Sequence, residues 1–306
     1  MSSIAGKERV EKVSADRWSA WVTNRRFGGD DEAKRKTDQF LEPIREHVLS
    51  LARIRPGDRV LDIASRDGYI ALGAIERVGD EGRVTFTERS EDLLKICREQ
   101  VRAAGLEHRA EFRILQPEAL DEVPDSAFDV VLMRSLLNYV PDKAGTIRAF
   151  HRVLKPGGRF AFVQMYATRQ NPGEFNGYRL PAVADLTERV QAVFEGARPQ
   201  TYSDFDERDL LGWIEGAGFA KVDLHHEIEI SDTSDWPVPD WERAQLVAAG
   251  PDQPSMIEAI STALTPDEAG RFIAALRPEV EGGRRGVRFP KTYGGAVRSG
   301  TEAAGR

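Results

Sequence analysis

The chain has little of several features that define common protein classes. It contains one cysteine, Cys97, in 306 residues, so no internal disulfide can form, and scaffolds that depend on disulfides are excluded. Cys97 falls in a helical pattern, where a buried thiol is expected. No run approaches the roughly 18 apolar residues of a membrane-spanning helix, and the first residues lack the apolar core of a signal peptide. These absences favour a cytoplasmic protein with no membrane partner.

Basic charge is scarce as well. The sequence has 43 Lys and Arg residues against 50 Asp and Glu residues, a formal net charge of −7. Nucleic acids bind surfaces with an excess of basic side chains. The composition therefore favours a small molecule over a nucleic acid as partner. It is compatible with a monomer or a homodimer.

The chain does contain a clear alternation of two patterns. Apolar runs predict strands near residues 58–63, 83–88, 110–115, 127–133 and 158–166. Amphipathic periodicity predicts helices near residues 68–78, 91–104 and 142–154. This alternation predicts a mostly parallel sheet with helices on both faces. Further strands are expected at residues 220–230 and 287–293, the last at or near the sheet edge, with residues 294–306 frayed.

The stretch from Val60 to Leu72 organises this pattern. It begins as a buried strand, passes through a tight loop at Ala64–Gly68 and continues with helical spacing. A strand, a small-residue turn and a helix open a nucleotide-binding βα unit, in which backbone N–H groups approach the ligand. Glu88 ends the next strand, 20 positions after Gly68. In nucleoside-binding folds such a carboxylate accepts hydrogen bonds from a ribose diol.

Two further stretches give the pattern its specificity: Phe128 to Lys143, and His151 to Phe160 with its Lys-Pro-Gly-Gly turn. Over residues 55–166 the series resembles the class I S-adenosylmethionine-dependent methyltransferases, in particular the bacterial small-molecule branch. The resemblance implies an α/β fold with a doubly wound, mostly parallel seven-stranded sheet. It also implies S-adenosylmethionine (SAM) as cofactor and S-adenosylhomocysteine (SAH) as product. The expected reaction transfers methyl to O, N or C of a small organic secondary metabolite.

The resemblance gives each part of the cofactor a place. Asp62 and the loop after it would meet the amino-acid end, and Glu88 the ribose. Gln116 stands where the family usually has an aspartate for the adenine amine, and its carbonyl can accept one hydrogen bond. The residues expected around the cofactor are Asp62, Ala64, Ser65, Arg66, Gly68, Glu88, Arg89, Gln116, Pro117, Arg134 and Ser135.

The loop departs from the family pattern of three glycines at alternate positions, because this chain has Ala64, Arg66 and Gly68 there. Arg66 is the larger change, since its side chain projects where glycine leaves room. In one interpretation Arg66 points away from the ligand and the backbone still supports binding, as the retained Asp62 and Glu88 favour. In the other, the cofactor site is eroded, and the fold serves as a cyclase, an isomerase or a cofactor-binding partner.

Candidates for catalysis follow the fourth strand. Tyr139 could hydrogen-bond a hydroxyl or phenol, Arg134 could bind a carboxylate, and Asn138 lies beside Tyr139. Methyl transfer needs mainly alignment and exclusion of water, so a polar rim without catalytic role is the open alternative. Cation-dependent catechol methyltransferases place a metal-binding aspartate after this strand. Arg134 cannot bind a metal, and no metal is predicted.

The remaining segments divide the chain. Residues 1–54 are expected to form an N-terminal helical lid, with core packing of Trp18 and Trp21 as the alternative. Residues 55–230 form the α/β core, with an excursion at 167–205. Residues 231–285 are expected to be a helical insertion that caps the site, in which Thr265 to Glu268 is a capping box. Residues 286–306 hold the last strand and a tail.

Overall fold

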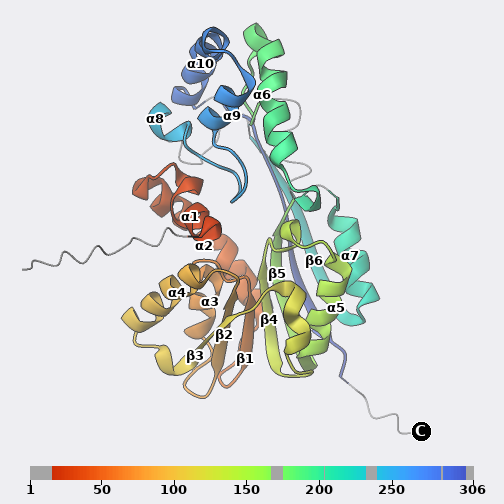
Figure 1. Cartoon of the computed structure of the whole chain (residues 1–306). Helices are drawn as coiled ribbons and strands as arrows, with labels where there is room; N and C mark the ends of the chain where they lie inside the picture. Colours follow the sequence, from red (N-terminus) through yellow and green to blue (C-terminus); the bar gives the residue numbers. More distant parts are fainter. Residues whose placement is uncertain (1–15, 167–174, 203, 232–239, 284, 301–306) are drawn as a thin grey trace, which may run out of the picture.

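The computed structural model describes residues 16–166, 175–202, 204–231, 240–283 and 285–300. Its centre is one seven-stranded sheet in the order β3-β2-β1-β4-β5-β7-β6 (Figure 1). The strands are β1 (Arg59–Ile63), β2 (Arg83–Glu88), β3 (Ala110–Ile114), β4 (Phe128–Arg134), β5 (Leu154–Met165), β6 (Phe219–Ser231) and β7 (Val287–Arg298). Strands β1 to β5 pair in parallel, and β7 runs antiparallel to both neighbours. The predicted doubly wound, mostly parallel sheet is confirmed.

Helices cover both faces of the sheet. On one face lie α2 (Asp31–Ala52), α3 (Tyr69–Ile75) and α4 (Glu91–Ala103), which share an apolar cluster with β1 and β2. On the other face lie α5 (Lys143–Val153) and α7 (Glu207–Gly216). The first turns of α2, α4, α5 and α7 are capped by the side chains of Asp30, Ser90, Asp142 and Asp206, which accept bonds from free backbone N–H groups.

The order of the strands places a ligand site. Because β1 lies between β2 and β4, the chain winds outward in both directions from the β1–β4 pair. In open α/β sheets, ligands bind at the carboxyl ends of the strands at such a switch point. The loops that follow β1 and β4 both open there.

The last strand lies next to the sheet edge, which agrees with the sequence expectation, but it is longer than expected. β7 lies between β5 and β6, so β6 forms the edge, and β7 extends through Arg298 instead of ending at residue 293. Gly294 explains the extension, because a Cβ atom there would collide with the ring of Phe162 on β5. The glycines that suggested a frayed end are therefore what allows the strand to pack.

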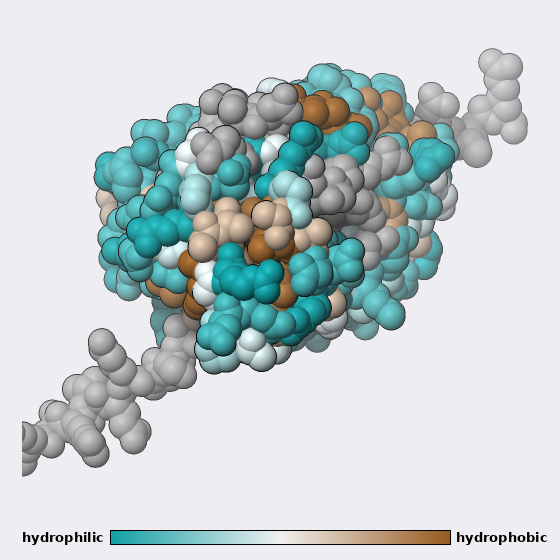
Figure 2. Space-filling model, turned by 90° about the horizontal axis from the view of Figure 1, so that it is seen from above, coloured by the Kyte–Doolittle hydropathy of each residue, from teal (hydrophilic) through white to brown (hydrophobic). Residues whose placement is uncertain are grey.

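A second helical layer lies above the sheet (Figure 1). It is formed by α6 (Ala184–Ala197), α8 (Trp241–Ala244), α9 (Met256–Ala263) and α10 (Pro266–Glu281), with a separate apolar cluster around Val190, Ile260 and Phe272. The predicted capping box is present, since Glu268 accepts a bond from the Thr265 N–H at 2.9 Å. Seen from this side, the molecule is mostly hydrophilic, and hydrophobic residues gather near the centre of the view (Figure 2).

The N-terminal helix α1 (Arg17–Thr23) and the short helix η1 (Arg25–Phe27) lie between the sheet and the second layer. Trp21 and Val22 pack against Leu93 on α4 and against Ala248. The Trp21 indole donates to the Ala248 carbonyl at 2.9 Å. Helix α1 is thus attached to both parts. Within the described ranges, we find no helix that is both apolar enough and long enough to cross a bilayer.

Candidate functional site

The loop between β1 and α3 turns at three alternate residues. Ala64, Arg66 and Gly68 all have left-handed backbone, with φ values of 56°, 56° and 82°. A left-handed backbone costs an L-residue about 1–2 kcal/mol, and glycine avoids this cost. At Ala64 and Arg66 the loop thus adopts a backbone that glycine would adopt freely. The strain is held in place by the surrounding structure.

Ser65 anchors this loop to the sheet. Its N–H donates to the Thr87 carbonyl at 2.8 Å, and its hydroxyl accepts from the Thr87 N–H at 3.2 Å. The Thr87 hydroxyl donates to the Asp62 carbonyl at 2.8 Å. Ser65 is buried and does not line the pocket. It positions the loop backbone, while the residues on either side of it face the pocket.

Gly68 is the loop residue that tolerates substitution least, and Gly57 offers a matched control. A Cβ atom at Gly68 would lie 3.1 Å from the Cys97 sulfur, whereas at Gly57, also left-handed, it would meet nothing within 4 Å. We expect Gly68→Ala to lower the free energy of unfolding by about 2–4 kcal/mol and Gly57→Ala by about 1–2 kcal/mol. Urea denaturation measures both. Equal losses would show that backbone strain, and not packing against Cys97, sets the cost.

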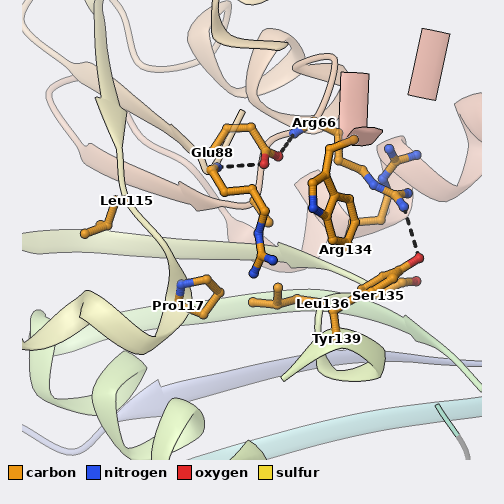
Figure 3. Close-up of a pocket in the computed structure, with 11 residues that line it drawn as sticks. Arg66, Glu88, Leu115, Pro117, Arg134, Ser135, Leu136 and Tyr139 are labelled. Atoms are coloured by element: carbon orange, nitrogen blue, oxygen red, sulfur yellow. Dashed lines mark hydrogen bonds between the residues drawn. The ribbon is translucent and has the colours of Figure 1, made fainter. Parts of the chain in front are cut away.

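Glu88 lies at the end of β2 and faces the pocket (Figure 3). Its Oε2 accepts from the Arg66 N–H at 2.9 Å, and its Oε1 accepts from the Arg89 N–H at 2.7 Å. A carboxylate has about four acceptor positions, so each oxygen can accept a further bond. The backbone thus holds Glu88 in a position to accept from two adjacent ribose hydroxyls.

An apolar wall stands opposite Glu88. It is made by Leu115 and Pro117 after β3 and by Leu136 after β4. Such a wall can hold the flat face of an adenine ring. Gln116 is exposed and is absent from the residues that line this pocket. The structure therefore places its two neighbours, and not the Gln116 side chain, at the position expected for the adenine.

Three large side chains line the pocket between these walls. They belong to Trp18 of α1, Arg66 and Arg89. The Arg89 guanidinium carbon lies 4.8 Å from the Trp18 ring centroid, and that of Arg66 lies 4.8 Å from the Trp21 ring centroid. The remaining cavity of about 30 Å³ has room for about two water molecules. The residues suit the chemistry of the cofactor, and these side chains must move outward to admit it.

The Arg66 side chain faces the pocket of Glu88, which is not the direction that the first interpretation of the loop expects. The Arg66 side chain lines the pocket, and its Nη2 donates to the Tyr139 hydroxyl at 3.5 Å (Figure 3). The physical reason is the Trp21 ring, which attracts the guanidinium by a cation–π interaction worth about 0.5–2 kcal/mol. Trp21 comes from a segment that sequence reasoning treated separately.

Asp62 lies beneath the loop at the end of β1. It is 3% exposed and is absent from the residues that line the pocket. Burial raises its pKa from the ordinary 3.8 to about 7, against the opposing effects of a hydrogen bond from Ser65 and the charge of Arg134. Near neutral pH this carboxyl is therefore poised between its charged and neutral forms.

Arg134 and Ser135 follow β4 on the other side of the loop. The Arg134 Nη2 lies 3.7 Å from the Asp67 Oδ1, and burial together with the charge of Arg66 lowers the Arg134 pKa. Ser135 has a left-handed backbone with φ of 50°, and its hydroxyl accepts from the Met165 N–H at 3.2 Å. Both residues line the pocket. The expected cofactor residues Ala64, Arg66, Glu88, Arg89 and Pro117 line it with them.

Tyr139 and Asn138 lie in the short helix η4 (Leu137–Tyr139) and face different surroundings. Tyr139 lines the pocket and packs edge-on against Trp18 and Tyr202, with centroid distances of 5.1 and 5.0 Å. The Asn138 amide donates to the Met165 carbonyl at 3.1 Å and accepts from Gln164 at 3.1 Å. Tyr139 is thus the candidate that reaches the ligand space, and Asn138 supports the end of β5.

A second pocket of about 160 Å³ adjoins the first. The two share Trp18, Arg89 and Tyr139. The other walls come from Arg17, the segment 199–202 and the segment 250–253. Sequence reasoning missed these two segments, because nothing in their composition marks them and only the fold brings them to Tyr139. Among the described residues, no three His, Cys, Asp or Glu side chains are grouped as metal ligands, and the absence of a catalytic metal stays a prediction.

Comparison with known proteins agrees with this geometry. Residues 54–218, more than half of the chain, match the family described as "Methyltransferase domain". The ubiquinone/menaquinone biosynthesis C-methyltransferase UbiE of Teredinibacter turnerae is 30% identical over 183 residues, which are 58% of this chain and 73% of that protein. UbiE of Xanthomonas oryzae is 31% identical over 182 residues, 58% of this chain and 72% of that protein.

The same architecture occurs in the crystal structure of the Bacillus subtilis YcgJ protein, with a TM-score of 0.51. The identity is 15%, and the likeness covers 83% of this chain and 98% of that one. The fold and the pocket define a nucleoside-binding α/β enzyme. The chain belongs to the class I SAM-dependent methyltransferases, so it is an enzyme whose cofactor is SAM.

Proposed function

We propose that the enzyme methylates O, N or C of a small organic metabolite bound in the second pocket. The observation that carries this proposal is that the second pocket shares Trp18, Arg89 and Tyr139 with the pocket of Glu88. A ligand on each side of these residues would place donor and acceptor next to one another. Bound SAM supplies the methyl group.

The walls of the second pocket favour an acceptor with a flat apolar part. Trp18, Tyr139 and Tyr202 form a chain of edge-on aromatic contacts. Tyr139 lines both pockets, and its hydroxyl would orient a hydroxyl or phenol of the acceptor. The UbiE relatives are named as C-methyltransferases of ubiquinone and menaquinone biosynthesis, which supports a small organic acceptor and includes carbon among the candidate atoms.

Helix α1 would act as the lid of this site. Trp18 lines both pockets, and Arg17 of α1 forms an ion pair of 2.7 Å with Asp252. Closure over the ligands would exclude water, which methyl transfer requires. The single cysteine favours a cytoplasmic setting for this reaction.

Calorimetric titration of SAM and SAH into cofactor-free protein tests the proposal first. We expect micromolar binding of both, followed by transfer of an isotopically labelled methyl group from SAM to members of a metabolite panel. Turnover of an acceptor by protein stripped of cofactor would contradict it and would favour a cyclase or isomerase.

Tyr139→Phe tests the acceptor side. We expect kcat to fall by about tenfold to a hundredfold, because the variant loses the hydroxyl that orients the acceptor, while the SAH dissociation constant stays unchanged. Tyr178→Phe, buried in the second helical layer, is the control and should keep full activity. An unchanged kcat in Tyr139→Phe would show that the Tyr139 ring lines the pocket and that its hydroxyl does not orient the acceptor.

A further inference from the structure

Three guanidinium groups crowd around the loop after β1. Arg66 comes from the loop itself, Arg134 from the end of β4 and Arg26 from η1. Arg26 and Arg66 both lie on the Trp21 ring, with guanidinium carbons 5.8 and 4.8 Å from its centroid. Burial and the charge of Arg66 lower the pKa of both Arg26 and Arg134. The three side chains therefore share one electrostatic environment and repel one another.

Of the carboxylates nearby, Asp67 and the buried Asp62 act on Arg134, and Asp67 also acts on Arg26. Asp67 lies 3.7 Å from Arg134, and its Oδ1 is buried without a hydrogen bond. Glu88 is bound to two backbone N–H groups. In the part of the chain that the structure describes, no ion pair within 4.0 Å joins Arg26 or Arg66 to a carboxylate. Arg26 and Arg66 are half-buried, and guanidinium groups without a carboxylate partner at such a place favour an anionic ligand.

Arg66 lines the first pocket and reaches a residue that lines both. Its Nη2 lies 3.5 Å from the Tyr139 hydroxyl, and Tyr139 lines both pockets. We propose that the methyl acceptor is an organic anion, a carboxylate or a phosphate monoester, whose charged group binds Arg66 within the field of Arg26 and Arg134. This inference rests on the proposed function, because it names the class of acceptor for the same site.

SAM itself also carries a carboxylate that could bind these arginines in place of the acceptor. SAM carries one carboxylate against two cationic groups, the ammonium and the sulfonium, so its net charge of about +1 adds to the positive charge of the site. Binding of SAM therefore leaves the arginines in excess. An anionic acceptor supplies the missing charge, and it does so next to Tyr139.

The first experiment compares benzoate and phenyl phosphate with neutral benzamide, on full-length protein saturated with SAH. We expect the two anions to raise the melting temperature of the wild type and benzamide to leave it unchanged. In Arg66→Gln the benzoate dissociation constant should rise by about tenfold, the loss of one charge-assisted contact. In Arg26→Gln it should rise by less, because Arg26 acts on the anion only through its charge. Arg25→Gln is the matched control, because the neighbouring Arg25 pairs with Glu258 at 2.7 Å. Equal effects of benzoate and benzamide, or no effect of either anion, would overturn the proposal.

The second experiment separates the two sources of the anion. Arg66→Gln is titrated with SAM and with decarboxylated SAM. We expect the substitution to change the two affinities by the same factor, because the carboxylate is the only difference between the two ligands. A loss confined to SAM would show that Arg66 binds the cofactor carboxylate and would overturn the assignment to the acceptor. Failure of SAH to bind the wild type would instead contradict the proposed function, so the two failures are distinguishable.

Discussion

Glu88→Ala should raise the SAH dissociation constant by about a hundredfold or more and abolish measurable methyl transfer. Each hydrogen bond between the carboxylate and a ribose hydroxyl is worth about 1.5–3 kcal/mol. The substitution also releases the N–H groups of Arg66 and Arg89, which Glu88 binds at 2.9 and 2.7 Å. Both the ligand contact and the loop that carries it are therefore lost. Calorimetric titration of SAH measures the effect.

The control is Glu111→Ala, on the neighbouring strand β3, where the carboxylate accepts from the Thr85 hydroxyl at 3.2 Å. We expect this variant to bind SAH like the wild type. Glu88→Gln is informative as well. Both Glu88 oxygens accept from backbone N–H groups, so a glutamine must direct its NH₂ group at one of those donors, and we expect weakened binding despite the similar shape. If both Glu88 variants bound SAH with the affinity of the wild type, Glu88 would not be a cofactor-binding residue.

Most of the core could be predicted from the sequence because its strands are buried on both faces. Such strands are continuous apolar runs, and the run Val60–Ile63 marks β1 within one residue of its observed bounds. Helix starts were visible for a similar local reason. Ser90 precedes two acidic residues and caps α4 through the Leu93 N–H at 3.1 Å. Both of these features are predicted by residues that lie close together in the sequence, and the structure confirms both.

The features that could not be predicted depend on distant segments. Arg66 faces the pocket because Trp21, 45 positions earlier in the chain, stands beside it. The length of β7 depends on the fit between Gly294 and Phe162. The second pocket needs residues 199–202 and 250–253 at Tyr139. In each case the feature depends on a contact between residues that are far apart in the sequence. The composition of the loop therefore indicated where the site lies but could not predict its shape.

Asp62→Asn should stabilise the protein at neutral and alkaline pH. The pKa of Asp62 is about 7 in the folded protein and 3.8 ordinarily, so between these values the folded state binds more protons than the unfolded state. Stability from this group therefore falls as pH rises from about 4 to about 7. The full difference of about 3 pK units sets an upper bound of about 4 kcal/mol. Denaturation of both proteins across this range should show no difference near pH 4 and the largest gain for Asp62→Asn above pH 7.

Cofactor binding would explain why the chain has Asp62 although this residue lowers the free energy of unfolding. The amino-acid end of SAM carries an ammonium, and it would sit against the loop above Asp62, where a negative charge favours it. Binding would then require the ionised form, so SAM affinity of the wild type should fall by about tenfold per pH unit below about 7 and level off above it. Asp62→Asn should bind SAM weakly at every pH, because it cannot ionise. A wild-type affinity independent of pH between 5.5 and 8 would mean that the ammonium does not reach Asp62. The cost in stability would then have no counterpart in cofactor binding.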